Sequence, residues 1–127
     1  MTAMEGKKTV VIVGASDKPD RTSHQLLTRL SARANYQAIP IHPRLKEIDG
    51  QPVLPSLANV QQRPDVVSLY VNAQTSQGLE ADLKRLRPGK VVFNPGAENP
   101  ALMRSLSLDG IEVEEACSLV LLSQNAL

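Results

Sequence analysis

The chain has 127 residues, 42% of them hydrophobic and 21% charged, and its formal net charge is +1. This size and composition predict a single globular domain over residues 1–127 with an ordered core at about residues 8–120, and the balanced charge argues against nucleic acid or an anionic membrane as a partner. Cys117 is the only cysteine, which excludes an intrachain disulfide, and no apolar run suits a signal peptide (residues 1–8) or a membrane span, so we expect a cytoplasmic protein.

The first half of the chain predicts a strand, a helix and a second strand. The β-branched run at residues 9–13 stops at Gly14, as is typical of a buried parallel strand. Apolar residues at helical spacing then predict a helix around residues 24–34. Residues 38–41 predict the second strand, and because Pro40 lacks an N–H group we expect it at a sheet edge or a bulge.

The second half repeats this alternation. Strands are predicted at residues 66–71, 91–93 and 111–113, and the helices between them carry leucines at helical spacing. The smaller elements expected are a short strand at 52–54, a helical turn at 56–60, a helix running from Leu79 to Pro88-Gly89, a helix with Asn99 as N-cap, and a final helix or irregular tail at 118–127. The alternation predicts an α/β fold, a single doubly wound, mostly parallel five-stranded Rossmann-like sheet with helices on both faces.

In such a sheet the ligand site lies beyond the carboxyl ends of the strands, where the strand order reverses. The loop after the first strand is the leading candidate, because Gly14 lets a ligand approach the backbone and the start of the next helix offers free N–H groups with Thr22 and Ser23. The alternative is structural: Gly14 makes only the turn, and Thr22 or Ser23 caps the helix. The other candidate places are the loops at residues 42–46, 72–76, 94–98 and 115–117.

The charges around this edge favour a ligand with several phosphates. A dinucleotide site would show G-x-G-x-x-G and an acidic residue after the second strand, but only Gly14 is present and the strand is followed by His42 and Arg44. Lys18, Arg21, Arg44 and Lys46 instead place four cations there, which suits a ligand that also carries a phosphate on its ribose. The alternative for each cation is an ordinary solvated surface residue.

The sequence resembles a known family, the small bacterial CoA-binding proteins, whose domain also occurs in the α subunit of succinyl-CoA synthetase and related acyl-CoA synthetases. The matching segments form an ordered set over about residues 8–120: Val11–Ser16, Arg21 with Ser23, Tyr36–Pro43, Asp49-Gly50, Leu54–Leu57, Pro64–Val71 and Phe93–Asn99. Two features differ from the family: His42 replaces a usual asparagine, and the C-terminal segment is less basic.

The resemblance implies a ligand, coenzyme A or an acyl-CoA, and a set of contacts. It implies that the pyrophosphate lies against Gly14, Ala15, Ser16 and Ser23, with Arg21 as a further matching residue of the same loop. It also implies that His42, Pro43 and Arg44 flank the adenosine and its 3′-phosphate, and that Val71, Asn72 and Ala73 line the groove.

No pair of residues in the sequence points to catalysis. His24 is expected to cap the first helix or to face solvent, His42 has no carboxylate fixed beside it, and Glu98 and Cys117 fall on separate loops. The sequence therefore predicts a non-catalytic CoA or acyl-CoA binding protein: a sensor, a carrier or a subunit of a larger complex. Two alternatives remain open, an NADP-linked oxidoreductase-type protein in which Arg44 holds the 2′-phosphate, and a degenerate fold that serves only protein–protein interaction.

Overall fold

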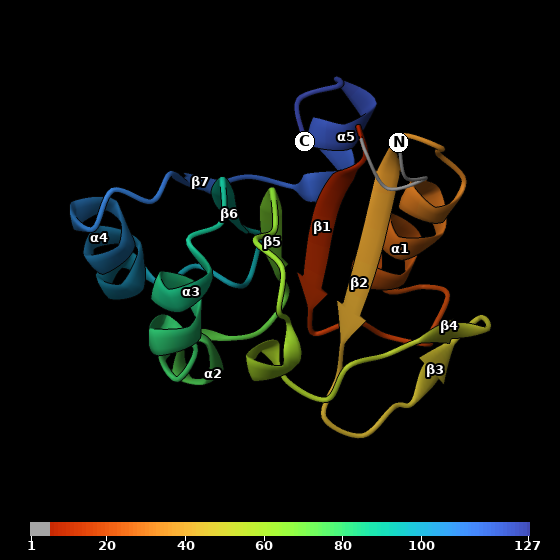
Figure 1. Ribbon diagram of the computed structural model, residues 1–127, viewed down its shortest axis with the longest axis horizontal. Coiled ribbons are helices and arrows are strands. Elements are labelled where there is room, and N and C mark those ends of the chain that lie inside the picture. Colours follow the sequence, from red (N-terminus) through yellow and green to blue (C-terminus); the bar gives the residue numbers. More distant parts are fainter. Residues whose placement is uncertain (1–5) are drawn as a thin grey trace.

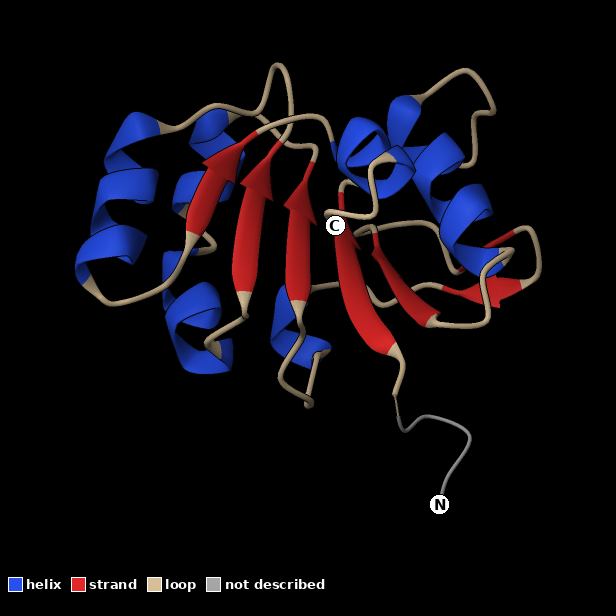
Figure 2. Cartoon of the chain, turned by 90° about the horizontal axis from the view of Figure 1, so that it is seen from above, coloured by secondary structure: helices blue, strands red, loops and turns tan. Residues whose placement is uncertain are grey.

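Five strands form one sheet in which every neighbouring pair is parallel. The computed structural model describes residues 6–127, and residues 1–5, which belong to the stretch judged unsuited to a signal peptide, lie outside the described residues. The strand order is β2-β1-β5-β6-β7, seen side by side in Figure 2, which confirms the expected α/β, Rossmann-like fold. The strands are β1 (Lys8–Val13), β2 (Tyr36–Ile41), β5 (Val66–Leu69), β6 (Lys90–Phe93) and β7 (Val113–Glu115).

Helices cover both faces of this sheet because its strands are apolar on both sides. In β1, Val10 and Ile12 pack with the leucines of α1 (Thr22–Ser31) and α5 (Ser118–Ser123). Val11 and Val13, which point the other way, pack with the leucines of α3 (Glu80–Leu86) and α4 (Pro100–Leu108). Figure 1 shows these two pairs of helices on opposite sides of the strands. A strand buried on both faces has a continuous apolar sequence, and this is the pattern that predicted β1.

Several predicted details are confirmed and others are wrong. Pro40 lies in the edge strand β2, as expected. The helix predicted from Leu79 onward is α3, and it is preceded by a separate short helix, α2 (Ala73–Gln77), from which Gly78 and Leu79 divide it. The structural alternative for Thr22 and Ser23 is wrong, because α1 has Arg21 at its N-cap position and no side chain within residues 6–127 caps it.

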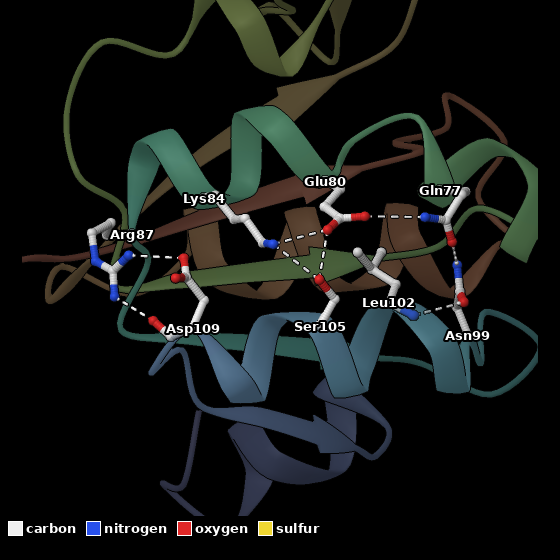
Figure 3. Close-up of polar contacts among 8 residues, drawn as sticks. All are labelled: Gln77, Glu80, Lys84, Arg87, Asn99, Leu102, Ser105 and Asp109. Atoms are coloured by element: carbon white, nitrogen blue, oxygen red, sulfur yellow. Dashed lines mark hydrogen bonds and ion pairs between the residues drawn. The ribbon is translucent and has the colours of Figure 1, made fainter.

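Polar contacts join α3 and α4 on the outside of the sheet (Figure 3). Asn99 caps α4 as predicted, accepting from the Leu102 N–H at 3.1 Å, and its amide group also donates to Gln77. The Ser105 hydroxyl donates to Glu80 at 2.6 Å. The pKa of the Glu80 carboxyl is lowered by this hydrogen bond and by Lys84. These contacts lie between the two helices and hold them side by side.

Between β2 and β5 the chain makes an excursion, residues 42–54, which we call the flap. It contains an antiparallel hairpin of β3 (Glu47–Ile48) and β4 (Gln51–Pro52), with both turn residues at positive φ, Asp49 at 50° and Gly50 at 80°. The short strand expected at 52–54 is thus shifted to β4, and Leu54 makes a single parallel bridge with Ile41. The predicted helical turn follows as η1 (Leu57–Asn59).

None of the helices within residues 6–127 is long and apolar enough to cross a membrane. The tail predicted after residue 118 is helical in α5 and irregular beyond it, where the Tyr36 hydroxyl donates to the Leu127 carbonyl at 3.1 Å.

Candidate functional site

A cavity of about 730 Å³ opens where the strand order reverses, between β1 and β5. After β1 the chain passes through α1 to β2 on one side, and β5 later pairs with β1 on its other side, so the loops that follow β1 and β5 diverge and leave a space. The flap and the loop after β6 complete its walls. Nine of the eleven predicted site residues line it, namely Gly14, Ala15, Ser16, Arg21, Ser23, His42, Pro43, Arg44 and Val71.

Backbone hydrogen bonds within the protein fix the conformation of the loop after β1. The N–H groups of Gly14 and Ala15 both donate to the Ile41 carbonyl, at 3.2 and 3.1 Å. Gly14 has a φ of 86°, and a Cβ atom there would lie 3.0 Å from Val71 Cγ1 and 3.1 Å from the Tyr70 carbonyl oxygen. Gly14 is therefore required by the close approach of the loop after β5. The amides of Gly14 and Ala15 are already used, and phosphate contacts must come from other groups.

The start of α1 supplies those groups. The first N–H groups of a helix have no acceptor within it, and at the start of α1 no side chain of the described residues serves as the acceptor. Thr22 and Ser23 therefore present free amides to the cavity, at the end of the helix that favours an anion. Lys18, Arg21 and Arg44 line the same cavity with one carboxylate, Asp17. Lys46, the fourth predicted cation, is not part of the lining.

His42 shapes the flap with its side chain. Its Nδ1 atom accepts from the N–H groups of Arg44 and Leu45, both at 3.0 Å. This is the turn that an asparagine oxygen would make at the same place, so the histidine keeps the acceptor that the family's asparagine would offer. His42 thus fixes the backbone that carries Arg44.

Two predicted residues lie outside the lining. The Asn72 side chain accepts from the Thr75 N–H at 2.9 Å and caps α2, while Ala73 begins that helix and its carbonyl accepts from Asn99. Thr75 lines the cavity in their place. The sequence held the signal for this, because asparagine is a preferred N-cap residue, but the helix it caps has only five residues and shows no periodicity. Five further lining residues were not among the predicted contacts: Tyr70 falls in the predicted third strand, whereas Leu45, Pro95, Gly96 and Ala97 belong to the candidate loops at residues 42–46 and 94–98.

Tyr70 brings a buried hydroxyl to the inner wall. The hydroxyl oxygen has no hydrogen-bond partner within the described residues, although the hydroxyls of Ser68 and Ser118 and the Cys117 thiol lie nearby. Burial raises the pKa of Tyr70 to about 12. The neighbouring polar groups are satisfied: Ser68 and Ser118 share a hydrogen bond of 2.7 Å, and Asn94 donates to Ser68 and accepts from the Ser118 N–H.

The candidates for acid–base or nucleophilic chemistry are not paired with one another in the described residues. The Glu98 carboxylate accepts from the Gly96 N–H, and Cys117 is half-buried outside the cavity lining. Within residues 6–127 no hydrogen bond joins any two of His42, Glu98 and Cys117. The expectation for His24 was wrong, since it is buried and its Nε2 atom lies 2.8 Å from an Asp49 carboxylate oxygen. No group of side chains in this part of the chain could hold a metal ion.

Known proteins share the sequence family and the fold of this chain. Residues 8–123 match the family described as CoA binding domain. The uncharacterized protein YneT of Bacillus subtilis is 30% identical over 76 residues, so the match spans 60% of this chain and about half, 56%, of that relative. A crystal structure of an uncharacterized protein, 31% identical, superposes with a TM-score of 0.87 over 95% of this chain and 98% of that one. The dinucleotide-forming acetyl-coenzyme A synthetase 1 of Ca. Korarchaeum cryptofilum shares the fold, with a TM-score of 0.69 at 23% identity over 84% of this chain and 25% of the synthetase.

Proposed function

The chain belongs to the CoA binding domain family, and from this premise we propose that the cavity between β1 and β5 binds coenzyme A or an acyl-CoA without transforming it. The observation that carries the proposal is the joint presence, in one cavity, of an uncapped helix start and three cations. Coenzyme A has three phosphate groups to place, and charge-assisted hydrogen bonds to phosphate are among the strong ones.

The two ends of the site suggest how the ligand lies. The pyrophosphate fits the start of α1, where Thr22 and Ser23 have free amides and Lys18 and Arg21 add charge. The 3′-phosphate on the ribose fits Arg44, which the flap contributes to the lining of the same cavity. The pantetheine arm is then left with the apolar side of the cavity at Val71 and Tyr70.

Isothermal titration calorimetry with CoA, dephospho-CoA, NAD and NADP tests this assignment. We expect CoA to bind most tightly, because no carboxylate follows β2 to hold a ribose diol. Tight binding of NADP alone would favour the oxidoreductase-type alternative, for which Arg44 would hold the 2′-phosphate. Absence of binding for all four would favour the interaction-only alternative.

Replacing Arg44 with alanine tests which phosphate of CoA this residue binds. CoA should lose about 10- to 100-fold in affinity, the equivalent of one charge-assisted hydrogen bond, and dephospho-CoA should lose much less. Lys46→Ala is the matched control, since it removes a cation of the same flap that does not line the cavity. Equal losses for the two ligands would contradict the place given to the 3′-phosphate.

The non-catalytic part of the proposal rests on the absence, within residues 6–127, of a hydrogen bond between any two of His42, Glu98 and Cys117, since covalent catalysis needs a nucleophile and a base in contact. We expect no hydrolysis of acetyl-CoA above the rate without protein. Turnover that disappears in Cys117→Ala would overturn this part and identify a nucleophile. We further propose a cytoplasmic location, in keeping with a cysteine that has no partner within the chain.

A further inference from the structure

The flap is attached to the sheet at its base. The Leu54 N–H donates to the Pro40 carbonyl and the His42 N–H donates to the Leu54 carbonyl, both at 3.0 Å. Its first part, residues 42–45, lines the ligand cavity. Figure 1 shows the hairpin of β3 and β4 beyond the end of β2, on the side of α1. The base therefore fixes where the flap starts and returns. Nearer the tip, Ile48 of β3 is 1% exposed and belongs to the core cluster that contains the leucines of α1, and polar contacts add to this packing.

Two polar contacts join the tip to α1. The Asp49 carboxylate lies 2.8 Å from His24 Nε2, and the Gln51 side chain donates to the Ser31 hydroxyl at 2.6 Å. His24 is buried, with 9% of its surface exposed, and directly follows Ser23 of the cavity wall. The contact at Asp49 thus connects the flap to the end of α1 that faces the ligand.

The turn itself does not need a carboxylate at Asp49. The residue has a φ of 50°, which glycine and asparagine adopt as readily as aspartate. Most of the Asp49 side chain, 62%, remains exposed, and its one hydrogen bond within the described residues goes to His24. The pairing with His24 therefore accounts for a carboxylate at this place in the hairpin.

Arg44 depends on the position of the flap. Its guanidinium makes no hydrogen bond or ion pair within residues 6–127, and its backbone N–H is held by His42, another residue of the flap. We propose that His24 and Asp49 are positioning residues of the ligand site, whose contact latches the flap to α1 and so sets Arg44 over the cavity for the ribose phosphate. This inference rests on the proposed function and adds the device by which the two walls of the site are held together.

Three variants distinguish the loss of the contact between Asp49 and His24 from a change in the turn and from the loss of an acidic charge. Asp49→Gly removes the acceptor and keeps a residue suited to positive φ. Asp49→Asn keeps both the turn and an acceptor oxygen for His24. Glu47→Gln is the matched control, because Glu47 is an exposed acid of the same hairpin and makes no side-chain hydrogen bond in the described part of the chain.

In calorimetric titrations, Asp49→Gly should weaken CoA binding between about twofold and tenfold, since a loosened flap is competent only part of the time. Dephospho-CoA, which lacks the phosphate assigned to Arg44, should change by less than about twofold. Asp49→Asn and Glu47→Gln should stay close to the unmodified protein. In an Arg44→Ala background, Asp49→Gly should have a clearly smaller effect on CoA binding, because the flap then positions only its other lining residues and no cation.

Hydrogen exchange measured on the ligand-free protein supplies a second test. Asp49→Gly should speed amide exchange in residues 42–54 and leave the strands of the sheet unchanged. Equal weakening of CoA and dephospho-CoA, or an effect of Asp49→Gly that is just as large in the Arg44→Ala background, would overturn the positioning role. Unchanged exchange in the flap would overturn the latch. If the unmodified protein binds none of the four nucleotides, the proposed function fails, and the exchange experiment still decides whether the contact holds the flap.

Discussion

Replacing Gly14 with alanine tests whether the loop after β1 is shaped by its protein neighbours. Two costs are expected at this position. A φ of 86° is unfavourable for any residue with a Cβ atom, by about 1–2 kcal/mol. The new methyl group would also lie 3.0 Å from Val71 Cγ1 and 3.1 Å from the Tyr70 carbonyl oxygen, and crowding of this kind costs about 1–3 kcal/mol.

Gly96→Ala provides the matched comparison. Gly96 has a φ of 90°, and a Cβ atom there would have no neighbour within 4 Å, so it carries the first cost alone. Urea denaturation should therefore show a loss of about 2–5 kcal/mol in the free energy of unfolding for Gly14→Ala and about 1–2 kcal/mol for Gly96→Ala. A loss of about 2–3 kcal/mol leaves a domain of about 5–15 kcal/mol folded enough to assay, whereas a loss of about 5 kcal/mol would unfold a domain at the lower end of that range.

Equal destabilisation by the two alanine variants would refute the reasoning, because it would leave no cost for the contact with residues 70 and 71. The sequence alone suggested that a side chain at Gly14 would collide with the ligand. In the structure, a Cβ atom added at Gly14 would point at the loop after β5. Gly14→Ala should therefore lower stability even in the absence of ligand.

Two further predictions concern the polar groups beside the cavity. Asn94→Ala should lower the free energy of unfolding by about 2–4 kcal/mol in urea denaturation, because it leaves the buried Ser118 N–H and part of the Ser68 pairing without partners; a loss below about 1 kcal/mol would contradict the importance of this network. Tyr70→Phe should leave stability at pH 7 unchanged or slightly higher, because the hydroxyl it removes has no partner in residues 6–127. The pKa of Tyr70 is raised from 10.0 to about 12 in the folded state, so the unfolded chain releases this proton first and the unmodified protein should lose stability from pH 10 to pH 12. If the free energies of unfolding of the two proteins changed equally between pH 10 and pH 12, this would contradict the raised pKa of a buried Tyr70 hydroxyl.

The fold could be predicted from the sequence because its elements carry local signals. The run from Thr9 to Val13 is apolar on both faces, and this pattern is typical of a parallel strand that is covered by helices on both sides. Pro40 marked an edge strand because it lacks a donor, and Asn99 marked a helix start because its side chain is an acceptor. The carboxyl ends of such strands must meet at one edge of the sheet, so the place of the cavity followed from the order of elements.

The finer features of the site depend on contacts between distant segments, which leave no local pattern. His24 and Asp49 are 25 residues apart, and their pairing requires a hairpin with two residues in each strand. The use of the Gly14 and Ala15 amides by Ile41 depends on the register between β1 and β2. Asn72 was misplaced because a short helix, α2, begins at Ala73, where the sequence predicted a loop at residues 72–76.

The edge strand β2 has a consequence for strand pairing between two copies of the chain. Along its outer side the backbone donors belong to alternate residues, Tyr36, Ala38, position 40 and His42. Tyr36 donates to the Arg33 carbonyl, His42 donates to the Leu54 carbonyl, and Pro40 has no N–H group to offer. Within the described residues this leaves Ala38 as the one amide on that side open to an incoming strand. A second chain that tried to extend the sheet there would find almost no ladder of donors, so the proline and the returning flap together protect this edge from the strand pairing that starts aggregation.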